Sequence, residues 1–286
     1  MLGKPQTAAG YVAGSRDLIQ ATCLYVATKL GDLLDDLVVV GGLVPSLIID
    51  QHALPDGAEQ HVGTMDLDIG LAVALLDENR YEDLTERLRQ AGFAADTNDA
   101  GKTIRQRWRY RGTPSVTVDF LIAPSFPDDR PGTLRSIEAD FAAIIAQALP
   151  LAFRDRQKIT LSGTTLLGEK ATRDIWVCGP GAFIVLKAFA WNNRGENKDA
   201  YDLYYVVRNF GTGPHDVAAA LIPLLDSQTA REAVEYIRRD FLDLDGAAAQ
   251  RVARFQTGDT DDEIQAEVVG MVGELIRIID AQTAVG

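Results

Sequence analysis

The spacing of apolar residues divides the chain into a part that mixes strands with helices and a part that is helical throughout. Runs of β-branched and apolar residues predict strands at residues 36–40, 63–73, 103–110 and 116–122, with shorter strand signals at 158–161 and 176–177. Helical spacing predicts helices at residues 15–34, 43–49, 78–91 and 136–148. The first part is therefore expected to be a mixed α/β domain.

After Pro180 the helical spacing continues almost to the end of the chain and is interrupted mainly at glycines. We expect breaks at Gly195, at residues 211–213, and near Gly246 and Gly258. The change of pattern places a domain boundary near Gly179. Residues 1–179 would form the α/β domain and residues 180–286 a helical domain.

Two aspartates in the predicted strand at residues 63–73 are the first candidates for chemistry. Successive side chains of a strand point to opposite faces, so Thr64, Asp66 and Asp68 share one face. Met65, Leu67 and Ile69 share the other face, which we expect to be buried. Two carboxylates this close repel each other unless a cation lies between them, and paired hard oxygen ligands suit Mg²⁺. The competing interpretation is a solvated face of an edge strand.

Three further features favour the metal site. Gly41 and Gly42 end an upstream strand where a helix begins, and a backbone without side chains can approach a phosphate there. Asp119 is the lone carboxylate of the apolar strand at residues 116–122. Because Asp is depleted in strands, a third metal ligand on a neighbouring strand would explain it. Thr64 lies close enough to Asp66 to bind a phosphate oxygen.

Charge narrows the partners that the chain can bind. With 28 basic and 41 acidic residues the net charge is −13, which disfavours a broad, sequence-independent grip on nucleic acid. A local exception is the segment Lys102–Arg111, where five of ten residues are basic. Strand parity puts four of them on one face, namely Arg105, Arg107, Arg109 and Arg111. This row is either a platform for a triphosphate or an RNA backbone, or a basic edge strand that discourages aggregation.

Composition also indicates the compartment. Hydrophobic residues make up 47% and charged residues 24%, as in soluble globular proteins. Cys23 and Cys178 fit neither a zinc spacing nor a disulfide framework, so we expect two buried, reduced thiols. No stretch reaches the roughly 18 consecutive apolar residues of a membrane span, and the N-terminus lacks the pattern of a signal peptide. We therefore expect a cytoplasmic protein that does not enter membranes.

The helical part contains a second group of charged residues. Lys187 lies among apolar neighbours, where a lysine either reaches toward solvent or contacts phosphate. A further alternative is an ion pair with Asp199 or Asp202, both of which follow Lys198 on the next predicted helix. His52, His61 and His215 show no metal-ligand spacing. His61, three residues before Thr64, either touches substrate or is a plain loop histidine.

The ordered set Gly41-Gly42, Thr64-x-Asp66-x-Asp68 and Asp119 resembles the DNA polymerase beta-like nucleotidyltransferase superfamily. Lys187 followed by Lys198-Asp199-x-x-Asp202 resembles, within it, the AbiEii group of abortive-infection toxins. The resemblance covers roughly residues 36–210. It implies an α+β fold, in which a polymerase-beta-like mixed sheet flanked by helices is followed by a C-terminal helical region that completes the active site. One departure is an inserted loop around residues 51–61, which lengthens the interval from Gly42 to Thr64.

The resemblance also implies a function. Its members transfer a nucleoside monophosphate from an NTP to an acceptor hydroxyl, here on an RNA such as tRNA, as toxins restrained by an antitoxin. It assigns two Mg²⁺ ions to Asp66, Asp68 and Asp119. Phosphate contacts fall to Gly41, Gly42 and Thr64, charge neutralisation to Lys187, and nucleotide binding to Lys198, Asp199 and Asp202.

Two other functions stay open. One is a small-molecule adenylyltransferase of the aminoglycoside-modifying kind. The other is a catalytically silent module that binds a nucleotide or a protein. The presence of all three carboxylates counts against the silent module, whereas nothing in the sequence names the acceptor.

Overall fold

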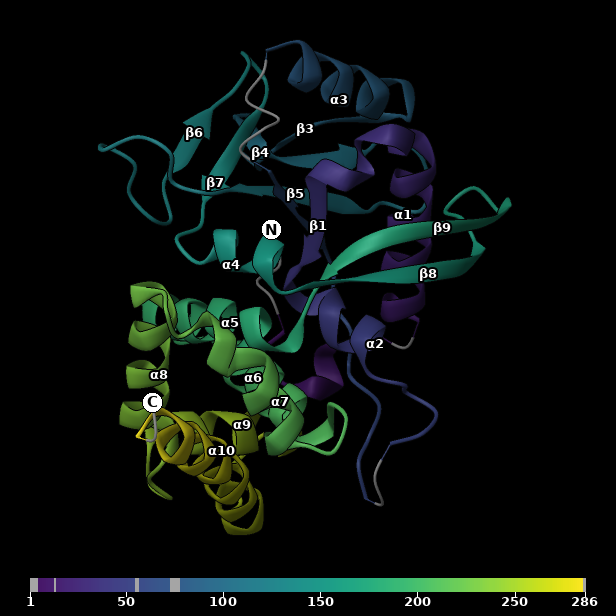
Figure 1. Cartoon of the computed structure of the whole chain (residues 1–286). Helices are drawn as coiled ribbons and strands as arrows, with labels where there is room; N and C mark the ends of the chain where they lie inside the picture. Colours follow the sequence, from purple (N-terminus) through teal and green to yellow (C-terminus); the bar gives the residue numbers. More distant parts are fainter. Residues whose placement is uncertain (1–4, 13, 55–56, 73–77, 285–286) are drawn as a thin grey trace. The chain divides into compact units, whose positions relative to one another are not determined.

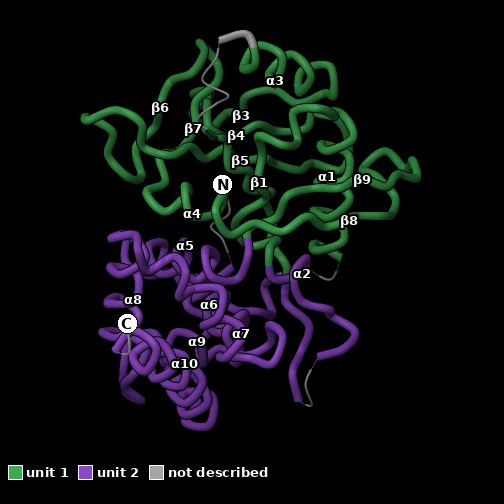
Figure 2. Tube along the Cα trace, viewed as in Figure 1, with its two compact units in different colours: residues 1–3, 13–44, 63–178 green, residues 4–12, 45–62, 179–286 purple. Residues whose placement is uncertain are grey.

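The computed structural model describes residues 5–12, 14–54, 57–72 and 78–284, and the chain divides into two compact units (Figure 2). The sheet unit contains Ala13–Val44 and Gly63–Cys178. The helical unit contains Lys4–Val12, Pro45–Val62 and Gly179–Gly286. It thus includes two segments that precede Gly179 in the sequence.

One mixed sheet forms the core of the sheet unit (Figure 1). Among the described residues it has nine strands in the order β3-β4-β5-β2-β1-β9-β8, with β7 beside β5 and β6 beside β7. The pairs β2–β5, β1–β9 and β5–β7 are parallel and the others are antiparallel, which confirms the expected α+β class. The strands are β1 (Leu37–Val40), β2 (Leu67–Leu71), β3 (Phe93–Thr97), β4 (Thr103–Tyr110), β5 (Thr117–Ile122), β6 (Leu134–Ser136), β7 (Ala142–Ile145), β8 (Arg156–Thr164) and β9 (Lys170–Cys178).

Helices flank this sheet because its strands carry large apolar side chains. Trp108, Val118 and Phe120 on the central strands are fully buried. The helix α1 (Ser15–Leu30) packs on β8 and β9, and α3 (Glu78–Gln90) packs on β3 and α1. The short helix α4 (Leu149–Arg154) packs on β1. Flanking helices on a mixed sheet are the arrangement that the resemblance implied.

The prediction of a helix at residues 136–148 is wrong. The stretch holds the end of β6 and all of β7, and α4 begins only at Leu149. A short apolar run can form a buried strand as well as a helix, and here the parallel pairing of Ile144 with Leu121 decides for the strand. The sequence pattern also missed β3, and it marked only parts of β8 and β9, which are nine residues each.

The helical unit confirms the helical spacing after Pro180. Its long helices are α5 (Pro180–Arg194), α6 (Asn197–Asn209), α7 (Pro214–Leu221), α8 (Gln228–Phe241), α9 (Ala247–Thr257) and α10 (Asp262–Thr283). Gly195 and Gly258 end α5 and α9 in the left-handed conformation, as their position in the pattern predicts. The helix α6 lies against α5, α7, α9 and α10, so that most of its side chains are buried.

The loop before the acidic motif also belongs to this helical unit. It follows the short helix α2 (Val44–Ile48) and is held against α6 by side-chain contacts. The Tyr205 hydroxyl lies 3.1 Å from Gln51 Oε1 and 3.1 Å from the carbonyl oxygen of Glu59. The inserted loop is therefore a structural part of the helical unit.

Two expectations from composition can be compared with the structure. Cys23 and Cys178 are buried thiols that form no disulfide, as predicted, and burial raises the pKa of the Cys23 thiol to about 12. None of the helices in the described part of the chain combines the length and the apolar character that crossing a membrane requires.

Candidate active site

The register of two parallel strands places Asp68 beside Asp119. Asp68 on β2 is paired with Asp119 on β5. Residues paired across adjacent strands point to the same face of a sheet, so both carboxylates leave the sheet on one side. Leu67 and Ile69 on the opposite face of β2 are buried, as strand parity predicted. The strands thus bring together two carboxylates that are 51 residues apart in the sequence.

Asp66 joins them from the segment that leads into β2. The strand begins at Leu67 rather than at Gly63, so the expected strand was too long at its start. The Thr64 hydroxyl donates a hydrogen bond to Asp66 Oδ1 at 3.0 Å, and both residues are buried. Met65 was expected on the buried face and is instead 53% exposed, because strand alternation does not extend to it.

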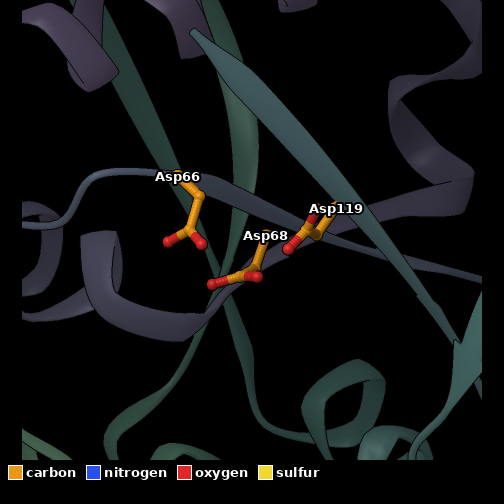
Figure 3. Close-up of side chains that lie close together, drawn as sticks. All are labelled: Asp66, Asp68 and Asp119. Atoms are coloured by element: carbon orange, nitrogen blue, oxygen red, sulfur yellow. The ribbon is translucent and has the colours of Figure 1, made fainter. Parts of the chain in front are cut away.

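The three carboxylates form one cluster, which we call the acidic cluster (Figure 3). One oxygen from each of Asp66, Asp68 and Asp119 lies within 4.8 Å of those of the other two. Gly41 makes room for it, because a Cβ on Gly41 would lie only 1.9 Å from Asp68 Oδ2. Its φ of +73° also favours glycine, and the buried Gly42 follows in the same 3-10 turn. Three hard oxygen donors at this spacing fit a divalent cation.

A guanidinium shares the acidic cluster. Arg107 on β4 is paired with Asp119 in the antiparallel register of β4 and β5. Its Nε and Nη2 donate to the two Asp119 oxygens at 2.7 and 2.5 Å. Nη2 also donates to Asp66 Oδ2 at 3.2 Å. The guanidinium thus supplies positive charge directly to the acidic cluster.

Two other arginines of the basic row, Arg109 and Arg111, also have partners in the sheet unit. Arg109 donates from Nε and Nη2 to the two oxygens of Asp96, both at 2.7 Å. Arg111 donates to the carbonyl oxygen of Ala95 at 2.9 Å. The interpretation as an edge strand is wrong, because β4 lies between β3 and β5. Binding of RNA to this row stays a prediction.

In the helical unit, a second group of charges surrounds Lys187, and we call it the lysine cluster. Lys187 Nζ lies 2.6 Å from Asp202 Oδ2 and 3.1 Å from Asp199 Oδ1. Lys198 Nζ lies 2.6 Å from Asp202 Oδ1, and Arg194 Nε lies 2.6 Å from Asp199 Oδ2. The structure thus shows the ion pair that was one alternative for Lys187, and its contact with phosphate stays a prediction.

Burial disfavours the charges of Asp202, Lys187 and Lys198, and opposite charges offset this cost to different degrees. Burial opposes the ionisation of Asp202, but Lys187 and Lys198 hold its pKa well below the usual value. Burial likewise opposes the charge on Lys187, but Asp202 and Asp199 raise its pKa. For Lys198, burial outweighs the attraction of Asp202 and lowers the pKa. Asp202 is therefore the shared anion of two buried lysines.

His61 is a buried member of the lysine cluster, so the interpretation as a plain loop histidine is wrong. Its Nε2 lies 2.9 Å from Asp202 Oδ1, and its Nδ1 lies 3.4 Å from Ser46 Oγ. Burial lowers the pKa of His61 to about 4, so the ring is neutral at neutral pH. Because an ionised carboxylate only accepts hydrogen bonds, we assign the ring proton to Nε2. Nδ1 then accepts from the Ser46 hydroxyl.

The structure thus distributes the candidate residues over two clusters. The sheet unit brings together Gly41, Gly42, Thr64, Asp66, Asp68 and Asp119. The helical unit brings together Lys187, Lys198, Asp199 and Asp202.

Sequence reasoning missed two partners, Arg107 and His61. Arg107 faces the same side of the sheet as Asp119, and a buried carboxylate in a strand calls for a counter-charge, so strand parity could have pointed to it. His61 is 141 residues from Asp202, and no pattern along the chain connects them.

Comparisons with known proteins show the family of the chain. A family described as "Nucleotidyl transferase AbiEii toxin, Type IV TA system" matches residues 35–277. No curated protein matches the chain significantly. Among solved structures, the chain is similar to an antigenic nucleotidyltransferase-like protein from Paracoccidioides brasiliensis, at 15% identity and a TM-score of 0.41, over 78% of this chain and 88% of that chain. Because the family match spans most of the sequence, the chain belongs to the AbiEii family of nucleotidyltransferase toxins of type IV toxin–antitoxin systems.

Proposed function

We propose that this nucleotidyltransferase transfers a nucleoside monophosphate from an NTP to an acceptor hydroxyl on an RNA such as tRNA, in a Mg²⁺-dependent reaction. The observation that supports the proposal is the convergence of three carboxylates, with oxygens within 4.8 Å of one another, beside the bare backbone of Gly41. We also propose that this toxin acts in the cytoplasm and is restrained by a cognate antitoxin, as the description of the family as part of a type IV toxin–antitoxin system suggests.

The residues of the acidic cluster fit Mg²⁺. Carboxylate oxygens are the hard ligands that Mg²⁺ prefers, and it takes its remaining ligands from water and substrate phosphates. Asp66, Asp68 and Asp119 would hold two ions. When bound, such ions neutralise the triphosphate and stabilise the attacking and leaving oxygens of the transfer.

Residues around the acidic cluster position its carboxylates and the substrate. The Thr64 hydroxyl orients Asp66 through its hydrogen bond, and Gly41 admits the carboxylate of Asp68 where any side chain would collide with it. We assign Asp119 to the activation of the attacking hydroxyl. Gly41, Gly42 and Thr64 also form the stretch of backbone and hydroxyl that we assign to the NTP phosphates.

The lysine cluster is proposed to contribute to nucleotide binding. Its two buried lysines are cations of the kind that contact an anionic phosphate. We assign the contact with phosphate to Lys187 and Lys198, and their orientation to Asp199 and Asp202. Lys198→Met is expected to weaken NTP binding, as measured by equilibrium dialysis with a labelled nucleotide.

Incubation with each α-labelled NTP, Mg²⁺ and total tRNA, followed by gel electrophoresis, tests the proposal. The wild-type chain is expected to label RNA with one preferred NTP, and Asp68→Asn is expected to abolish the labelling. Asp96→Asn serves as a matched control, because Asp96 on β3 pairs with Arg109 on β4 and is not in the acidic cluster. Equal labelling by Asp68→Asn would contradict the site. Labelling of aminoglycosides but not of RNA would contradict the acceptor.

A further inference from the structure

Arg107 is placed where a metal ion would have to compete with it. Its guanidinium donates to both oxygens of Asp119 and to one oxygen of Asp66, two of the three residues proposed to hold Mg²⁺. The side chain is 22% exposed, so the ion pairs are largely shielded from water. Within the described residues no hydrogen bond from Arg107 to Asp68 is present. The guanidinium of Arg107 therefore lies on the Asp66–Asp119 side of the acidic cluster.

Arg109 lies on the same strand as Arg107 but outside the acidic cluster, so the two arginines can be compared. It makes the same two-pronged pair, with Nε and Nη2 each 2.7 Å from one oxygen of Asp96. That pair joins one cation to one carboxylate, and Arg109 is more exposed, at 36%. Arg107 instead serves two carboxylates with a third, Asp68, beside them. Its charge offsets a repulsion that Arg109 does not face.

We propose that Arg107 is an internal counter-ion of the acidic cluster, which holds Asp66 and Asp119 together in the absence of metal and competes with a divalent cation for them. This inference rests on the proposed function of the cluster as a metal site. It makes two metal positions unequal: a cation that uses Asp66 has to displace one hydrogen bond of the guanidinium, at 3.2 Å, whereas a cation that needs Asp119 has to displace two, at 2.5 and 2.7 Å. Arg107 is then a positioning residue that sets how tightly the Asp119-dependent position binds metal.

Binding of Mn²⁺ to the metal-stripped full chain, without nucleotide, tests this inference. Free Mn²⁺ is measured by electron paramagnetic resonance for the wild type, for Arg107→Gln and for the matched control Arg109→Gln. Arg107→Gln is expected to bind the Asp119-dependent ion roughly ten- to a hundredfold more tightly, because hydrogen bonds between charged groups no longer have to be broken. Arg109→Gln is expected to bind like the wild type. Equal affinity of Arg107→Gln and Arg109→Gln would overturn the inference.

Two further measurements keep the test decisive. If Arg107→Gln does not fold without metal, Arg107→Lys replaces it, since lysine keeps the charge but loses the two-pronged geometry. Arg107→Lys is expected to bind Mn²⁺ more tightly than the wild type, and wild-type affinity would overturn the inference. Absence of Mn²⁺ binding in every variant, wild type included, would instead remove the proposed metal site on which the inference rests.

Discussion

Two aspartate clusters in this chain are built in opposite ways. The acidic cluster gathers Asp66, Asp68 and Asp119, and the guanidinium of Arg107 pairs with two of them. In the lysine cluster, three cations share two carboxylates, and the Asp202 side chain is completely buried. Both clusters contain aspartates of the motifs identified in the sequence, but these aspartates have different roles in the two clusters.

The two clusters differ in how far ion pairs within the chain compensate for the charge of their aspartates. Aspartates of the acidic cluster repel one another, and Arg107 offsets part of this repulsion. Asp202 already has its cations, and removing its charge leaves buried lysines without a partner. The loss of one carboxylate charge is therefore expected to have opposite effects on stability in the two clusters.

The largest effect on stability is expected for Asp202→Asn. This change removes the shared anion of Lys187 and Lys198, and breaking a buried ion pair costs about 3–5 kcal/mol. Urea unfolding at neutral pH measures it. Asp280→Asn, which breaks the solvent-exposed pair with Arg238, is the control and is expected to cost less than about 1 kcal/mol. Equal costs for the two variants would mean that the lysine cluster is no more than a surface network.

Acidification is expected to weaken the helical unit through His61. The pKa of His61 is about 4 in the folded chain and about 6.5 in an unfolded one, so the unfolded chain binds more protons between these values. Stability should therefore fall as the pH falls from about 6.5 to about 4, by about 3 kcal/mol at most for this group. Urea unfolding across this range measures the loss.

The histidine responsible can be identified by substitution. His61→Gln is expected to flatten the pH dependence in that window, because glutamine does not titrate. His215→Gln is the matched control, since His215 is an exposed histidine of the same unit. If the stability of His61→Gln falls with pH as steeply as that of His215→Gln, other groups are responsible for the pH dependence.

A smaller loss is expected for Gly41→Ala. Its Cβ would lie 1.9 Å from Asp68 Oδ2, and the positive φ adds strain, so we expect a cost of about 3 kcal/mol. Gly258→Ala has a similar φ of +92° but no atom within 4 Å of the added Cβ, so it isolates the strain at about 1–2 kcal/mol. Thermal unfolding of both variants checks the difference. If they lose the same stability, Asp68 does not depend on Gly41 for its position.

The smallest effect, of opposite sign, is expected for Asp68→Asn in the absence of metal. Removing one of three neighbouring negative charges should leave stability unchanged or raise it by up to about 1 kcal/mol. Urea unfolding in the presence of a chelator measures it, beside Asp202→Asn under the same conditions. A loss as large as that of Asp202→Asn would mean that the acidic cluster is a structural ion network and would end the comparison.

The helical part of the fold could be predicted because its signals are local. Apolar spacing after Pro180, with glycines at Gly195 and Gly258, marked helices that the structure confirms. The sheet was harder, because the run at Phe141–Ile145 is compatible with either element. Pairing with β5 made part of it a strand, and pairing between segments far apart leaves no trace in a window of neighbouring residues.

The candidate site divides along the same line. Strand parity grouped Asp66 with Asp68 and singled out Asp119, because each judgement needs only a few consecutive residues. Strand parity also placed Arg107 beside three other arginines, but the neighbour of β4 was unknown, and an edge was expected where a central strand lies.

The sequence by itself determined which residue types are available, the helices whose periodicity is local, and the acidic motif that identifies the family. Only the tertiary structure decided which charges compensate one another. Arg107 meets Asp119 through the register of β4 on β5, and His61 meets Asp202 across a loop closed onto α6. Ion pairs form between groups that folding brings within a few ångströms, and that distance depends on how the elements pack rather than on their order in the chain.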